Sequence, residues 1–293
     1  ADNPEDPKQG TPSFEYGTEA EYEVKNGTIL IFDATTDKFV TSANLGTMNP
    51  WTDVKADGVT TAAIATVKLS NVSVTGNYNA LVLLNNNTAD EATKKVTLPT
   101  DADTYETWSK DVSKAKAANY VSTDGIFMAN APMYSATSDP TTLVKIKNVC
   151  ASPEEAQAKA ATTIYVERGL AKVTMKDFKT GGYTIGGGTY DGATVKIEKW
   201  QLDVTNNSTF PVHQIGDLSS ATTGFADIWK TDRFYDQTST AFQRVYWGVD
   251  PNYNDAQYLD LAKCKTAFKM IKNKEVTGDA GEANPQYCLE NTF

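Results

Sequence analysis

The sequence has little of the chemistry on which catalytic and metal sites depend. Histidine occurs once, as His213, so neither an HExxH motif nor a three-histidine metal site can form within one chain. The three cysteines, Cys150, Cys264 and Cys288, lack CxxC spacing, which argues against a zinc site or a disulfide framework. We expect buried free thiols, with one bridge such as Cys264–Cys288 as the alternative.

Arginine and long apolar runs are also scarce. Only Arg168, Arg233 and Arg244 are arginines, and the formal net charge is −10. Nucleic-acid binding needs a concentrated basic face, so this balance argues against a nucleic-acid partner. No run reaches about 18 apolar residues, so we predict that nothing in the chain spans a membrane.

Short β-strand patterns dominate what is present. The hydrophobic fraction of 40% can supply a core. Asn26–Gly27 predicts a two-residue hairpin turn between strands at 21–24 and 28–34. Turn residues separate the further apolar runs, a pattern typical of a β-sandwich. These runs cover residues 37–42, 60–70, 72–76 and 79–85.

Three stretches have helical patterns instead. An amphipathic helix is predicted over 101–121, with Asp103 and Glu106 as its capping box. Its apolar positions recur at helical spacing: Tyr105, Trp108, Val112 and Ala115. Proline followed by carboxylates predicts a short helix over 153–161. A third helix or helical turn is predicted over 255–271.

A glycine-dense stretch, "TGGYTIGGGTYDG", predicts a flexible turn between two β domains. We place the N-terminal domain at residues 1–182, with 1–13 flexible, and the C-terminal domain at 183–293. A phosphate-binding loop is the weaker interpretation, because the Lys-Ser/Thr ending of a P-loop is missing. Asp191 also stands where the third glycine of GxGxxG would follow Gly186 and Gly188.

Other candidate sites are incomplete. His213 could serve a Ser–His–Asp triad, but no GxSxG motif accompanies it, and we expect a lone, partly exposed histidine. "DPNYND" (250–255) begins like an EF-hand loop, but Asp255 and Leu261 replace the required Gly and Glu, which favours a simple turn. We therefore predict no catalytic, cofactor-binding or metal-binding residue, no cofactor and no enzymatic activity.

Scattered tryptophans offer one further alternative. A surface platform of aromatic side chains could bind sugars, although tryptophans in β domains are more often core residues. The residues concerned are Trp51, Trp200, Trp229 and Trp247.

The stretch "TTIYVERGLAKVTMKDF" (162–178) changes face partway. Arg168 shares its parity with the apolar residues before Gly169, whereas the apolar residues after Leu170 have the opposite parity. We predict a β-bulge at Gly169, which would re-aim the strand. Arg168 would then lie at a rim, either reaching water or pairing with a carboxylate.

Five stretches together resemble a known family, the Bacteroidales fimbrillins. They are "NALVLLNN" (79–86), "IYVERGLAKVTM" (164–175), "WQLDVTNNS" (200–208), "RVYWGVDPNY" (244–253) and "YCLENTF" (287–293). They follow the family's order, and within the family the chain looks most like the stalk subunit of the minor, or short, fimbriae of the Porphyromonas type.

The resemblance implies a mainly β fold with two transthyretin-like β-sandwich domains, the second incomplete at its C-terminus. It also implies a structural pilus subunit, exported as an outer-membrane lipoprotein and freed of an N-terminal segment by an Arg-specific protease. Partners would be other copies of the chain, accessory pilins, and host proteins or other bacteria as adhesion targets. The mature form would lie at the cell surface without spanning the membrane.

In this scheme a strand of one subunit fills a groove in the next, and Ala1 fits the start of a processed form. Residues 21–34, or the segment before them, are then expected to border the groove. Two alternatives remain: an accessory or tip adhesin of the same pilus system, and a secreted carbohydrate-binding protein.

Overall fold

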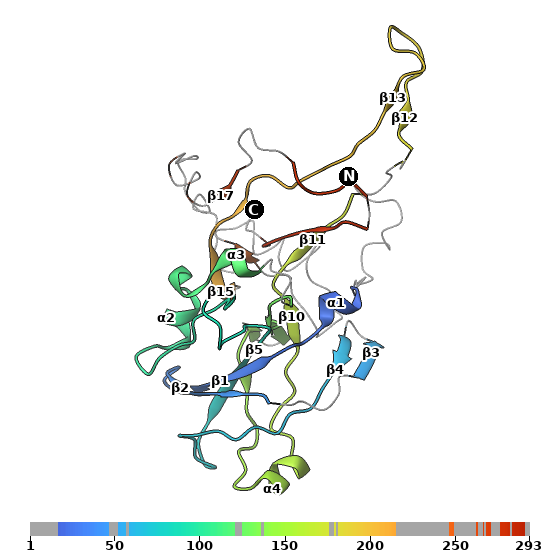
Figure 1. The fold of residues 1–293 in the computed structure, drawn as a ribbon. Coiled ribbons are helices and arrows are strands. Elements are labelled where there is room, and N and C mark those ends of the chain that lie inside the picture. The colour runs from blue at the N-terminus through green and yellow to red at the C-terminus, as the bar shows by residue number, and fades with distance from the viewer. Residues whose placement is uncertain are drawn as a thin grey trace.

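The fold consists mainly of antiparallel strands with a few short helices, which confirms the predicted mainly β class (Figure 1). The computed structural model describes residues 17–46, 52–56, 59–120, 125–135, 138–175, 179, 181–214, 246–248, 262, 266, 268–270, 276–281 and 283–290. The predicted helix over 255–271 lies largely outside these residues, which include a two-residue strand, β17 (Phe268–Lys269), at its end.

One central sheet holds the longest strands. Its order is β10-β6-β5-β1-β2, and β9 also pairs with β5. The bounds are β1 (Gly27–Asp33), β2 (Phe39–Asn44), β5 (Tyr78–Leu84), β6 (Met128–Asn130), β9 (Val144–Lys145) and β10 (Val166–Arg168). β1 and β5 pair without a register shift, from Gly27 opposite Leu84 to Asp33 opposite Tyr78.

Both faces of β1 and β5 are buried, which explains why their sequences are almost continuously apolar. Leu30 and Leu81 face the main core, whereas Ile31 and Ala80 face a second cluster on the other side. Because successive side chains of a strand alternate between faces, a strand covered on both sides needs apolar residues at every position.

Short helices and a second strand pair cover the face of the main core. They are α2 (Tyr105–Ser109), η1 (Val112–Lys114), α3 (Ala117–Tyr120), β15 (Thr209–Gln214) and β16 (Tyr246–Gly248). Trp108, Tyr120, Val212 and Trp247 from these elements are buried with β1 and β5 in one cluster. Residues on both sides of Gly182 therefore share this core, while the division into two domains stays a prediction.

The single helix predicted over 101–121 is wrong, because the chain forms three short helical pieces there. Asp111 accepts hydrogen bonds from the backbone N–H and the hydroxyl of Ser113, a local arrangement that competes with a continuous helix. The capping box is formed by Thr104 and Thr107 instead of Asp103 and Glu106. The predicted short helix is confirmed as α4 (Pro153–Ala158), with Ser152 as its N-cap.

The Asn26–Gly27 hairpin is also wrong. Residues 19–22 form a helical turn, α1 (Glu19–Tyr22), and no strand precedes β1 within the described residues. Asn26 binds the loop after β5 instead. Its backbone carbonyl accepts from the N–H of Asn85 at 2.9 Å, and its side-chain Oδ1 accepts from the backbone N–H of Asn87 at 3.0 Å. These tertiary contacts determine the local conformation in place of the turn propensity.

The remaining strands form two-stranded sheets. The pairs are β3 (Thr52–Ala56) with β4 (Val59–Ala62), β7 (Met133–Ser135) with β8 (Ser138–Thr141), β11 (Ala171–Val173) with β18 (Gln286–Cys288), β12 (Tyr183–Thr184) with β13 (Thr194–Val195), β14 (Thr205–Asn206) with β17, and β15 with β16. Only the start of the strand predicted over 60–70 is paired, as the end of β4, and the strand predicted over 72–76 does not form.

The glycine-dense stretch forms the tip of a β-hairpin rather than a simple flexible turn. β12 and β13 stand away from the rest of the described structure (Figure 1). Gly187 and Gly188 at the tip have φ values of +82° and +78°, a region that favours glycine. Gly187 donates its N–H to Asp191 at 2.6 Å, so Asp191 closes the tip.

Asn130 fills a break in the central sheet. β5 pairs with β9 at one end and with β6 at the other, which leaves its middle without a strand partner on that side. The fully buried amide of Asn130 accepts from Val82 N–H at 2.8 Å and donates to the carbonyls of Ala80 and Thr142. A side chain thus satisfies backbone groups that would otherwise be costly to bury.

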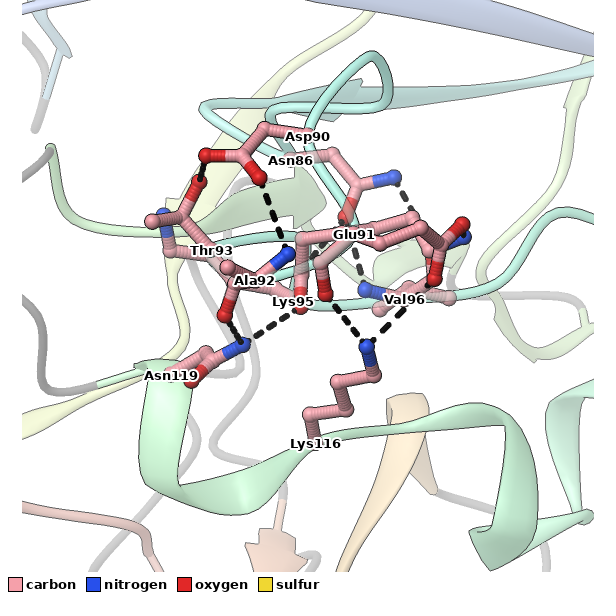
Figure 2. Close-up of polar contacts among 10 residues, drawn as sticks. Asn86, Asp90, Glu91, Ala92, Thr93, Lys95, Val96, Lys116 and Asn119 are labelled. Carbon is pink, nitrogen blue, oxygen red and sulfur yellow. Dashed lines mark hydrogen bonds and ion pairs between the residues drawn. The ribbon is translucent and has the colours of Figure 1, made fainter.

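The asparagines after β5 fix the following loop in a similar way. Figure 2 shows the Asn86 side chain bonded to the backbone of Lys95 and Val96; its Oδ1 accepts from Val96 N–H at 2.7 Å. Lys116 and Asn119, at the start of and within α3, donate to backbone carbonyls of residues 91–94. The "NALVLLNN" stretch therefore ends in a polar network that ties β5 to α3.

Candidate functional site

Several of the stretches that carry the family resemblance meet in space. β11, from 164–175, pairs with β18, which belongs to the terminal stretch, with Ala171 opposite Cys288. The N–H groups of Trp247 and Gly248, from 244–253, both donate to the carbonyl of Glu290. The segments thus form one packing unit although they are far apart in the sequence.

The change of face in 162–178 is explained by a change of sheet. Residues 166–168 form β10 in the central sheet, and residues 171–173 form β11, which pairs elsewhere. The bulge predicted at Gly169 is therefore wrong: Gly169 is a bend between two strands, and its N–H donates to Phe127 at 2.9 Å. Leu170 then packs against the main core.

A buried carboxylate joins the N-terminal helix to the C-terminal strand. Glu21 is only 6% exposed. Its Oε1 accepts from the hydroxyl of Tyr287 at 2.6 Å and lies 3.0 Å from Nζ of Lys172, and its Oε2 accepts from Thr18 N–H at 2.6 Å. We call Glu21, Lys172 and Tyr287 the terminal clasp, because it connects α1, β11 and β18.

The clasp stabilises the charged form of Glu21. Burial raises the pKa of Glu21, but the hydrogen bonds from Tyr287, Thr18 and Lys172 outweigh it and hold this pKa at about 2. Conversely, burial and the bond to Glu21 raise the pKa of Tyr287 to about 12. Glu21 is therefore a carboxylate, and Tyr287 a neutral phenol, across the physiological range.

Arg168 lies beside this clasp, while its predicted position at a rim stays a prediction. A Cβ built on Gly17 would come within 2.3 Å of its Nη1 and 2.7 Å of Oε2 of Glu21. Gly17 also has a φ of +78°, so both space and conformation favour glycine there. Sequence patterns could not reveal the clasp, because Glu21 and Tyr287 are 266 positions apart.

His213 is buried, so the expectation of a partly exposed histidine is wrong. It is 1% exposed, and its ring packs edge-on against Trp247. Nε2 lies 2.8 Å from the hydroxyl of Thr142, and Nδ1 lies 2.8 Å from Oε1 of Glu167. Burial raises the pKa of Glu167, and His213 only partly opposes this rise.

The other sequence candidates fall into two groups. Trp247 is a core residue, and Trp200 is partly buried. Trp51, Trp229 and residues 250–255 lie outside the described residues.

Cys150 and Cys288 are free and half-buried, and Cys264 lies outside the described residues. Within the described residues no three His, Cys, Asp or Glu side chains are grouped to hold a metal ion, and no helix is long and apolar enough to cross a membrane.

Comparisons with solved structures include two loose likenesses, both to proteins of one organism. No protein-family model and no curated protein matches the sequence. A fimbrial assembly protein from Parabacteroides distasonis is 14% identical with a TM-score of 0.38, covering 94% of this chain and 80% of that one. A proposed cell adhesion protein from the same organism is 12% identical with a TM-score of 0.37, covering 97% and 68%. TM-scores this low carry no argument about function.

Proposed function

We propose that this chain is a non-enzymatic structural subunit of an adhesive cell-surface pilus, of the fimbrillin type that its motifs resemble. The observation that carries the proposal is the packing of the motif segments on one another through β11, β16 and β18. Stretches that resembled the family only by chance would not be expected to pack on one another. The stalk role within short fimbriae belongs to this proposal, as does export as a lipoprotein.

We further propose that subunits join by strand exchange after removal of an N-terminal segment, and that the incoming strand pairs with β2. Among the described residues β1 is the only strand that pairs with β2. Phe39 N–H, at the start of β2, donates to the carbonyl of Asp103, so the outer edge is open to a strand over residues 40–44. β1 lies directly beside it, in keeping with the expectation that residues 21–34 border the groove. Head-to-tail addition of this kind does not close and produces a filament.

The hydrogen bonds between β1 and β2 identify a substitution that would prevent pairing at the open edge of β2 without disturbing β1. Leu45 N–H donates to Gly27 across the β1–β2 pair, and alternate residues of an antiparallel strand point the same way. The N–H of Ser42, an exposed residue, therefore points outward. Ser42→Pro removes that donor without removing a bond to β1, and proline is tolerated on edge strands in this orientation.

Electron microscopy of the processed protein tests both levels of the proposal. We expect regular fibres from the wild type and from Ser42→Ala, and folded monomers from Ser42→Pro, with circular dichroism as the check on folding. Fibres from Ser42→Pro would refute the β2 edge as acceptor. Wild-type monomers under every processing condition would refute the structural role and favour an accessory or tip subunit.

A further inference from the structure

A cavity lies between α2, β5, β9 and β15 and contains none of the three residues of the terminal clasp. Its volume is about 580 Å³, within the range of small-molecule sites. It is lined by residues of α2, β5, β9 and β15, and by residues 141–143, which lead from β8 into β9. The cavity therefore brings together residues from positions 79 to 214 of the chain.

The floor of the cavity consists of buried polar groups. Ser109, Thr142, His213 and Gln214 line it, and each is at least nine-tenths buried. Gln214 donates to the carbonyl of Ser109 at 3.0 Å, and the Thr142 hydroxyl lies 2.8 Å from Nε2 of His213. These bonds hold the floor in one arrangement, and buried polar groups fixed in this way are a feature of specific sites.

Among the described residues, one positive charge on the rim of the cavity has no counterion. Lys110 is paired with Glu106 at 3.2 Å, so these two charges offset each other. Lys145 is exposed, and no described residue bonds its ammonium group; the same holds for the amide of Asn79. The ammonium group of Lys145, over a hydrogen-bonding floor, can pair with a ligand that carries a negative charge.

We propose that this cavity binds an acidic sugar residue. The carboxylate would pair with Lys145. The hydroxyls would bond to the amide of Asn79, to the hydroxyl of Thr141 and to the amide oxygen of Gln214, whose NH2 group already donates to the carbonyls of Ser109 and Val212. Amide and hydroxyl side chains offer both donors and acceptors, as sugar hydroxyls require. The inference rests on the proposed adhesive role, because the sugar would be the class of ligand to which such a subunit binds.

The sole histidine of the chain provides a direct assay. His213 gives a single imidazole Cε1–Hε1 signal in a carbon–proton NMR spectrum of the whole chain, and it lies in the cavity floor. We expect glucuronate to shift this signal in a saturable manner, with a Kd on the order of 1 mM. Glucose, which lacks the carboxylate, and acetate, which lacks the hydroxyls, are expected to bind at least about tenfold more weakly.

Two matched variants complete the test. Lys145→Met is expected to weaken glucuronate binding at least about tenfold, whereas Lys196→Met, at an exposed lysine after β13, leaves it unchanged. Absence of a saturable shift, equal binding of glucose or acetate, or wild-type affinity in Lys145→Met would each overturn the proposal. Lys145→Met still forms fibres if the pilus role holds, so failure of the sugar site and failure of the pilus role are distinguishable.

Discussion

Replacing Glu21 with glutamine tests the terminal clasp, which joins the two ends of the described structure. Glu21→Gln keeps the size of the side chain but removes the charge to which Thr18, Lys172 and Tyr287 donate. Hydrogen bonds to charged groups contribute about 1.5–3 kcal/mol. Because Lys172 keeps some contact with water, we expect a loss of about 2 kcal/mol, or a fall in Tm of roughly 4–8 °C.

Urea unfolding at pH 7, followed by circular dichroism, measures this loss. Glu19→Gln is the matched control, since Glu19 is an exposed carboxylate on the same helical turn. A double-mutant cycle with Tyr287→Phe isolates the bond across the clasp, with an expected coupling of about 1 kcal/mol. Equal stability of Glu21→Gln and Glu19→Gln would refute the role given to the clasp.

The pH dependence gives an independent test of the same group. The pKa of Glu21 is about 2 in the folded chain, compared with an ordinary value of 4.5. Its contribution is therefore complete above about pH 4.5 and is lost as the pH falls from there towards 2. We expect the stability difference between wild type and Glu21→Gln to shrink over that window, and a difference that stays constant down to pH 2 would contradict the lowered pKa.

Two further predictions concern the sheet and the thiols. Asn130→Ala leaves three buried backbone groups without their partner, and we expect a loss of at least about 3 kcal/mol in the free energy of unfolding by urea; a loss under about 1 kcal/mol would contradict the role of this amide. In a Cys264→Ser background, Cys288 is expected to react with a disulfide reagent at pH 8 more slowly than Cys150, because burial and then the charge of Glu290 raise the pKa of Cys288. Faster reaction of Cys288 would contradict this order.

The sequence correctly predicts the elements whose structure depends mainly on the residues within them. β1 and β5 were predicted from dense apolar runs, and α4 from a proline followed by carboxylates. The failures lie where distant contacts decide the local structure. Asn26–Gly27 has strong hairpin propensity, but Asn26 is held by the loop after β5, and tertiary contacts override a turn preference of this size.

The candidate site was harder to predict than the fold. The change of parity at Gly169 was visible in the sequence, but a bulge and a change of sheet leave the same pattern. His213 stands out in the sequence as the sole histidine, yet its burial depends on contacts with Glu167, Thr142 and Trp247 from three other segments. Nothing in the spacing of these residues indicates that they meet.

The terminal clasp also has a mechanical consequence. In the proposed pilus a subunit would bear tension, and Glu21 and Tyr287 are bonded across 266 positions of chain. While that bond holds, it would keep α1 and β18 together. Once it breaks and the sheets in between unfold, the chain between the two residues could extend to roughly 900 Å, at about 3.4 Å per residue. The strength of the clasp would then set the force at which a subunit begins to lengthen.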